Sequence, residues 1–131
     1  MFWAALAARV LLGGMFLVFG LNGLLPTPFV EVPPPPNDVA KSFLKTLYAD
    51  SNYLKTVKLL EVVGGALVLS GRLVPLGLVI LTPIAVNILF YEVFLIGTAG
   101  PGLPLVVLCA ALIWAYRSHF APLFALKPRI G

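Results

Sequence analysis

Two apolar runs joined at Arg72 decide the fold: YLKTVKLLEVVGGALVLSGRLVPLGLVILTPIAVNILFYEVFL, from Tyr53 to Leu95. Each run is close to the roughly 20 residues that a helix needs to cross a bilayer. Because the connection around Arg72 is so short, helices at about 53–71 and 73–95 must be antiparallel neighbours. The stretch therefore predicts an antiparallel pair of membrane-spanning helices.

Two further apolar runs, at about 2–25 and 103–120, flank this pair. The whole chain of 131 residues is 60% hydrophobic and only 11% charged. A water-soluble domain of this size is excluded, because its surface would be largely apolar. We expect one domain, residues 1–131, with an all-α fold: a polytopic membrane protein built as an antiparallel bundle of four transmembrane helices.

The loop between the first two spans, residues 26–52, is Pro-rich and contains an amphipathic segment. Asn37 or Asp38 is predicted to cap a short helix that reaches about Ala49. One face of this helix is apolar and carries Val39, Phe43, Leu44, Leu47 and Tyr48. That pattern is typical of a helix that lies flat on the membrane or on the other spans. A cap over the bundle and a partner-binding helix both fit it.

Lysine and arginine residues predict the orientation, because cytoplasmic loops carry an excess of them. If both termini lie on one side, that side carries Arg9, Arg72, Arg117, Lys127 and Arg129. The other side carries Lys41, Lys45, Lys55 and Lys58. The short loop at Arg72 and the basic C-terminal tail favour cytoplasmic termini. We therefore expect a multi-pass protein of the cell (inner) membrane.

Glu61 and Asn87 are polar residues inside predicted spans, and such residues are functional candidates. Counted from the turn, Glu61 lies about 15 Å along its helix and Asn87 about 21 Å. Each side chain tilts toward the N-terminus of its own helix, so the two are predicted to meet at nearly one depth. Arg9 and Lys58 are possible further partners of Glu61. Tyr91 follows Asn87 by one turn on the same face.

Two interpretations of this cluster stay open. In the first, the polar groups form an interhelical clasp that fixes helix register. In the second, Glu61, Asn87, Arg9 and Tyr91 bind a polar headgroup, a quinone carbonyl or a proton. Glu92 lies higher, near the predicted outer interface.

Other chemistry-bearing residues are few. Cys109 is the only cysteine, which excludes an internal disulfide. We expect its side chain to serve as a small packing group. His119, the only histidine, reads as an interfacial residue, with a contact to a pigment or haem as the alternative. No metal site is predicted. No dense basic cluster suggests nucleic acid as a partner.

Several segments together resemble the DoxX-like family of membrane proteins. They are ARVLLG at 8–13, FGLNG at 19–23, EVVGG at 61–65, SGR at 70–72, VPL at 74–76 and PIAVNI at 83–88. The resemblance implies a four-helix membrane protein, in some members associated with a thiosulfate:quinone oxidoreductase or other membrane oxidoreductases. Glu61, Asn87 and Arg9 match the shared pattern, which assigns them no settled catalytic role. Many relatives have a histidine where this chain has Tyr91-Glu92, so that histidine's role does not carry over.

We expect a non-catalytic accessory subunit of a larger electron-transfer or photosynthetic membrane complex. The alternatives are a membrane oxidoreductase subunit that binds a quinone or small molecule at Glu61 and Asn87, and a small-solute transporter. No intrinsic cofactor is expected, although a quinone, lipid or pigment could bind the bundle surface. The expected partners are membrane lipids and a larger membrane protein complex.

Overall fold

The computed structural model describes residues 1–25, 34–48 and 51–131, and within these ranges the chain is all-helical and has no strand. The main elements are α1 (Phe2–Leu24), α2 (Asp38–Tyr48), α3 (Tyr53–Ser70), α4 (Val74–Phe90) and α5 (Gly102–Ala115). A π-helical turn, η1 (Tyr91–Ile96), continues α4, and two 3-10 turns, η2 (Arg117–His119) and η3 (Ala121–Phe124), follow α5.

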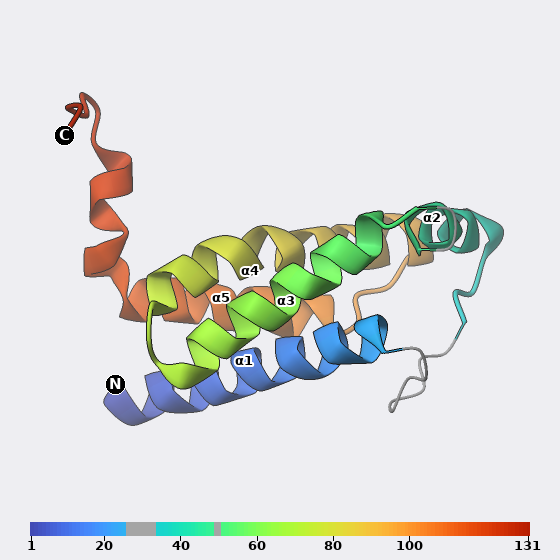
Figure 1. Ribbon diagram of the computed structural model, residues 1–131, viewed down its shortest axis with the longest axis horizontal. Helices are drawn as coiled ribbons and strands as arrows, with labels where there is room; N and C mark the ends of the chain where they lie inside the picture. Colours follow the sequence, from blue (N-terminus) through green and yellow to red (C-terminus); the bar gives the residue numbers. More distant parts are fainter. Residues whose placement is uncertain (26–33, 49–50) are drawn as a thin grey trace.

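Four helices lie side by side and alternate in direction along the chain (Figure 1). α1 contacts α3 and α5, and α4 contacts the same two helices, so the four surround one core. The short turn at Arg72 joins α3 to α4 as predicted. Both termini lie at the end of the molecule that carries this turn, while α2 lies at the opposite end (Figure 1).

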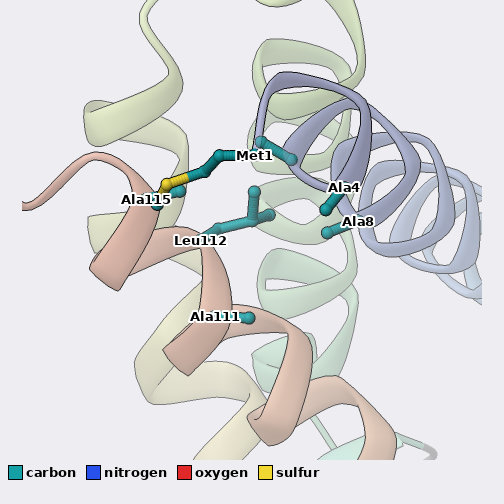
Figure 2. Close-up of a pocket in the computed structure, with 7 residues that line it drawn as sticks. Met1, Ala4, Ala8, Ala111, Leu112 and Ala115 are labelled. Atoms are coloured by element: carbon teal, nitrogen blue, oxygen red, sulfur yellow. The ribbon is translucent and has the colours of Figure 1, made fainter.

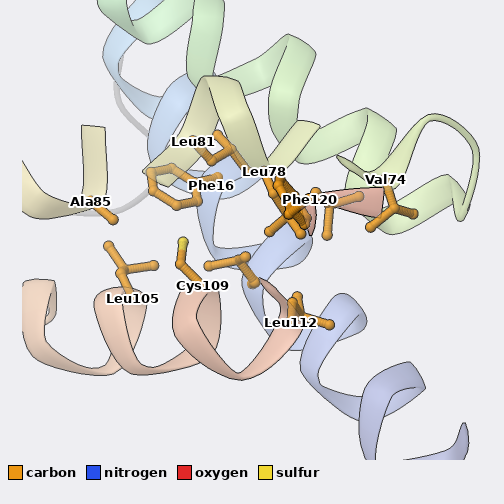
Figure 3. Close-up of a cluster of buried hydrophobic side chains, with 11 residues drawn as sticks. Phe16, Val74, Leu78, Leu81, Ala85, Leu105, Cys109, Leu112 and Phe120 are labelled. Carbon is orange, nitrogen blue, oxygen red and sulfur yellow. The ribbon is translucent and has the colours of Figure 1, made fainter. Parts of the chain in front are cut away.

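The hydrophobic core runs along the axis between these helices (Figure 3). It comprises Leu12, Phe16, Val68, Val74, Leu78, Leu81, Ala85, Leu105, Cys109, Leu112 and Phe120. On α4 the core positions recur at Val74, Leu78, Leu81 and Ala85, the spacing of one helix face. Cys109 is buried in this cluster, in agreement with its predicted packing role.

Glycines set the distance between α1 and α3. A Cβ atom at Gly13 would lie 2.9 Å from the carbonyl oxygen of Gly65, and one at Gly65 would lie 3.0 Å from the carbonyl oxygen of Gly13. At Gly20 a Cβ would lie 2.9 Å from the carbonyl oxygen of Lys58. The two backbones therefore touch along several turns, a contact that only glycine allows without displacement.

Two helical stretches, Phe2–Leu24 and Val74–Ile96, are long and apolar enough to cross a membrane. α5 is apolar but has only 14 residues, about 21 Å of helix, which is less than a bilayer core of about 30 Å. α3 has 18 residues and carries Lys55, Lys58 and Glu61.

The last predicted span, 103–120, ends earlier as an α-helix than expected, at Ala115. Tyr116 leaves the helical conformation, and the chain continues in 3-10 turns. This break lets Phe120 fold back into the core beside Val74 and Leu78 (Figure 3). The third predicted span, 73–95, is helical from Val74 onward, but its last turn is a π-turn in which the Gly97 N–H donates to the Glu92 carbonyl (2.8 Å).

The predicted helix in the first loop is present as α2, and its predicted cap is confirmed. The Asn37 side chain accepts a hydrogen bond from the Ala40 N–H at 2.8 Å. α2 packs on α3 and η1; Ala40 is fully buried, Phe43 stacks on Tyr91 of η1, and Val39 stays exposed. Residues 26–33 of the Pro-rich loop and residues 49–50 lie outside the described part of the chain.

The glycine contact predicts opposite effects for two adjacent substitutions. Gly13→Ala should lower the free energy of unfolding by about 1–3 kcal/mol, because its methyl group collides with α3. Gly14→Ala should be neutral or stabilising by up to about 1 kcal/mol, since nothing lies within 4 Å of its Cβ. Unfolding in mixed detergent micelles, followed by circular dichroism, measures both. Equal stability of the two variants would contradict the contact.

Candidate functional site

Glu61 lies on the buried face of α3, with Gly64, Gly65 and Val68. Its side chain is only 1% exposed, and one carboxylate oxygen, Oε2, lies 3.1 Å from Lys58 Nζ. Lys58 is one turn away on the same helix and is 20% exposed, so it connects the buried carboxylate to the bundle surface. The other oxygen, Oε1, is buried and has no hydrogen-bond partner among the described residues. The carboxylate is thus paired within its own helix.

Asn87 does not meet Glu61, and the predicted interhelical clasp is wrong. Asn87 is exposed, and its Nδ2 donates to the Pro83 carbonyl of its own helix at 2.9 Å. The depth argument ignored the direction around the helix axis. Asn87 follows the buried Ala85 by two residues, which is about 200° around a helix of 3.6 residues per turn. Its amide therefore faces away from the core.

Arg9 also lies apart from Glu61. Its Nε donates to the Val68 carbonyl at 3.1 Å, and its Nη2 approaches the Leu69 carbonyl at 3.4 Å. These carbonyls belong to the last turn of α3, about 10 Å along the helix from Glu61. Arg9 thereby joins the Gly71 N–H as a donor to the Val68 carbonyl, and its positive charge suits the helix C-terminus. Gly71 leaves the space that the guanidinium occupies.

Glu92 holds the start of α5. Its Oε1 accepts the Gly102 N–H at 2.6 Å in a buried hydrogen bond. A Cβ on Gly100 or on Gly102 would collide with this carboxylate. Gly100 and Gly102 thus let the loop backbone pass close to the Glu92 carboxylate. Glu92 caps α5 although it belongs to a different helical segment, η1. The sequence placed Glu92 near the interface but did not reveal this contact.

Tyr91 and Asn87 line one cleft at the surface. The cleft has a volume of about 260 Å³ and lies between α2 and the end of α4 with η1. Its lining is Phe43, Asn87, Phe90, Tyr91, Phe94 and Leu95. The rings of Phe43 and Tyr91 stack with centroids 5.6 Å apart and an interplanar angle of 26°. We call this feature the aromatic cleft. The four predicted site residues thus fall in three places: Glu61 inside the bundle, Arg9 at the α3–α4 turn, and Asn87 with Tyr91 in the aromatic cleft.

A second hollow, of about 110 Å³, lies between the start of α1 and the end of α5. Figure 2 shows Ala4 and Ala8 of α1 facing Ala111, Leu112 and Ala115 of α5 across it, with Met1 at its mouth. All its side chains are apolar, and most are alanines. We call this feature the alanine hollow.

His119 is exposed on a 3-10 turn, and its ring lies 6.3 Å from that of Tyr116. Among the described residues, no three or more His, Cys, Asp or Glu side chains are grouped so that they could hold a metal ion. Whether His119 contacts a pigment or haem stays a prediction.

Two asparagines matter more than the sequence indicated. Asn37 caps α2 and also donates through Nδ2 to the Leu95 carbonyl at 2.6 Å, which ties α2 to η1. Asn22 is buried near the end of α1. The Asn37 cap was visible as an asparagine after a proline run, but its second bond depends on the π-turn of η1. Asn22 stood out only as part of the FGLNG segment.

Comparisons with protein-family models, with curated proteins and with solved structures find no match to this chain.

The contact between Glu92 and Gly102 predicts that Glu92→Ala destabilises the start of α5. Loss of the acceptor should lower the free energy of unfolding by about 1 kcal/mol or more, as for loss of a helix cap. Amide hydrogen exchange at Gly102 should accelerate accordingly. Glu92→Gln is the matched control, because it keeps an oxygen at this place and should lose less. Unchanged exchange in the alanine variant would rule out the cap.

Proposed function

We propose that this chain is a multi-pass membrane protein and serves as a non-catalytic accessory subunit of a larger electron-transfer or photosynthetic membrane complex. Its four spans would be α1, α3, α4 with η1, and α5 with the 3-10 turns that follow. The observation that carries the proposal is the inverted distribution of side chains. Large apolar side chains cover the outside of the bundle, while the carboxylates of Glu61 and Glu92 are buried inside it.

The outer surface suits lipid. Each of the four long helices exposes large apolar side chains along its length: Val10, Leu11 and Val18 on α1, Leu59, Leu60 and Val63 on α3, Leu76, Val79 and Phe90 on α4, and Leu103, Val107 and Trp114 on α5. A water-soluble monomer rarely exposes contiguous apolar surface of this extent. These side chains support α3 and α5 as spans beside the two helices that qualify by length and composition.

Charged residues gather at the two ends of the bundle. Arg9 and Arg72 lie at the end with both termini, and Lys41 and Lys45 lie on α2 at the other end. This separation supports four spans in the cell (inner) membrane, and the short loop at Arg72 with the basic C-terminal tail favours cytoplasmic termini. Lys58 reaches the surface near the α2 end, where the Glu61 carboxylate holds it.

The interior polar contacts support an accessory role. Glu61 pairs with Lys58 of its own helix, and Glu92 caps α5, so both buried carboxylates are engaged in structural contacts. The resemblance of several segments to DoxX-like proteins is the ground for an electron-transfer complex as the host. The alanine hollow supports a protein partner, since small side chains let helices approach closely in lipid.

The proposed topology predicts the side from which two positions are labelled. In a Cys109→Ala background, Lys41→Cys should react with a membrane-impermeant maleimide on intact cells. Arg72→Cys should react only after the membrane is permeabilised. Both positions are exposed, so access depends on the side of the membrane alone. Labelling of both positions from one side would contradict the multi-pass arrangement. If Arg72→Cys reacted on intact cells and Lys41→Cys only after permeabilisation, the orientation would be the opposite of the one proposed.

The accessory role predicts that the chain, purified from its native membrane in mild detergent, migrates with larger subunits. Filling the alanine hollow with Ala4→Leu and Ala111→Leu should reduce this co-purification at least fivefold, because a partner helix could no longer approach. Val79→Leu, on the exposed side of α4, is the matched control and should leave it unchanged. A wild-type chain that runs alone would overturn the proposal.

A further inference from the structure

The aromatic cleft combines ring-lined walls with two polar groups. Phe43 comes from α2, Phe90 from the end of α4, and Tyr91 and Phe94 from η1. Asn87 and Tyr91 contribute the polar atoms. Ligand sites typically have this composition, in which apolar and aromatic walls surround a few polar groups that fix orientation.

The walls of the cleft are held in place before any ligand binds. The Asn37 Nδ2 bond to the Leu95 carbonyl, at 2.6 Å, fixes the start of α2 against η1. The stacked rings of Phe43 and Tyr91 fix the same pair of elements almost two turns further along α2. η1 itself is a π-turn, a rare element that often occurs at functional sites. A preformed cleft binds more tightly, because less side-chain freedom is lost on binding.

The polar atoms of the cleft have unused hydrogen-bonding capacity. Asn87 Nδ2 donates to the Pro83 carbonyl, which fixes the amide. Within residues 1–25, 34–48 and 51–131, neither Asn87 Oδ1 nor the Tyr91 hydroxyl has a hydrogen-bond partner. Asn87 is exposed and Tyr91 is partly exposed, so a bound molecule can reach both groups. A ligand that offers a donor to Asn87 Oδ1 or an acceptor to the Tyr91 hydroxyl would use this capacity.

We propose that the aromatic cleft binds the ring of a membrane-dissolved molecule, a planar ring that bears a hydroxyl or carbonyl oxygen and an apolar tail. The ring packs against the aromatic walls, where aromatic pairs contribute beyond the area that they bury. A ring hydroxyl donates to Asn87 Oδ1, and a ring carbonyl accepts from the Tyr91 hydroxyl. The volume of about 260 Å³ holds one substituted ring, so the tail extends along the exposed Phe90 and Phe94 into lipid.

This inference depends on the proposed function only for the membrane location of the cleft. Glu61 takes no part, because its carboxylate is buried on the core face of α3 and pairs with Lys58. The shared ligand chemistry has two sources in a membrane, quinones and ring alcohols or phenols. Their ring oxygens differ, since a quinone offers only acceptors whereas a phenol also offers a donor.

Calorimetric titration of the purified chain in detergent micelles tests the site with three probes that share one tail: decylbenzoquinone, 4-decylphenol and decylbenzene. The first or the second should bind saturably, and decylbenzene, which lacks an oxygen, should bind at least tenfold more weakly. Tighter binding of the quinone or of the phenol identifies the class of natural ligand, and equal affinity means that any ring oxygen is recognised. Each of these three outcomes supports the site. Absence of saturable binding, or equally tight binding of decylbenzene, would overturn it.

Two substitutions locate the binding on these residues. Asn87→Leu should weaken 4-decylphenol about five- to tenfold, and Tyr91→Phe should weaken decylbenzoquinone similarly, because each removes one hydrogen bond. Tyr91→Phe keeps the ring that stacks on Phe43, and Asn87 is exposed, so both variants should fold as the wild type does. Tyr53→Phe, an exposed tyrosine on α3, is the matched control and should change affinity less than twofold.

Affinities unchanged in both cleft variants would place the binding elsewhere and end the proposal. The test is independent of the accessory role, since the isolated chain is titrated. A chain that binds the probes but co-purifies with no partner would keep the cleft and overturn only the proposed function. A chain that co-purifies with a partner but binds no probe would keep the proposed function and overturn the cleft.

Discussion

The close contact of α1 with α3 is the constraint on which the rest of the structure depends. Gly13 and Gly65 bring the two backbones together, and Gly20 continues the contact toward the α2 end. Small residues that let two helix backbones approach closely gain van der Waals contact along the whole interface. The same approach brings Arg9 within reach of the last carbonyls of α3.

Three charged side chains then find partners in different parts of the molecule. Glu61 uses Lys58 one turn away, Arg9 uses the end of α3, and Glu92 uses the Gly102 N–H in the neighbouring loop. These contacts lie at different depths and hold different parts of the bundle. The polar residues of the helices therefore do not form one central site. Among the described residues, Glu61 Oε1 stays without a partner inside the bundle, and Asn87 and Tyr91 line the aromatic cleft at the surface.

Sequence reasoning succeeded where the signal is local. The helices at Tyr53–Ser70 and Asp38–Tyr48, the turn at Arg72 and the cap at Asn37 all follow from nearby residues. It failed for Asn87 because α4 is apolar on nearly every side, so the pattern does not single out a buried face. It placed the end of α5 too late, since the break at Tyr116 serves the distant packing of Phe120 against Val74.

The sequence alone determined the all-helical class, the number and order of the apolar segments, and the polar residues worth following. These properties depend on composition and on the residues next to each position, which the chain carries in any conformation. Only the tertiary structure decided that Arg9 reaches the end of α3, that Glu92 caps α5, and that Asn87 joins Tyr91 in a surface cleft. Those pairings depend on how far each helix is rotated and shifted against its neighbours. Contacts between distant glycines set that rotation and shift, and no local pattern encodes it.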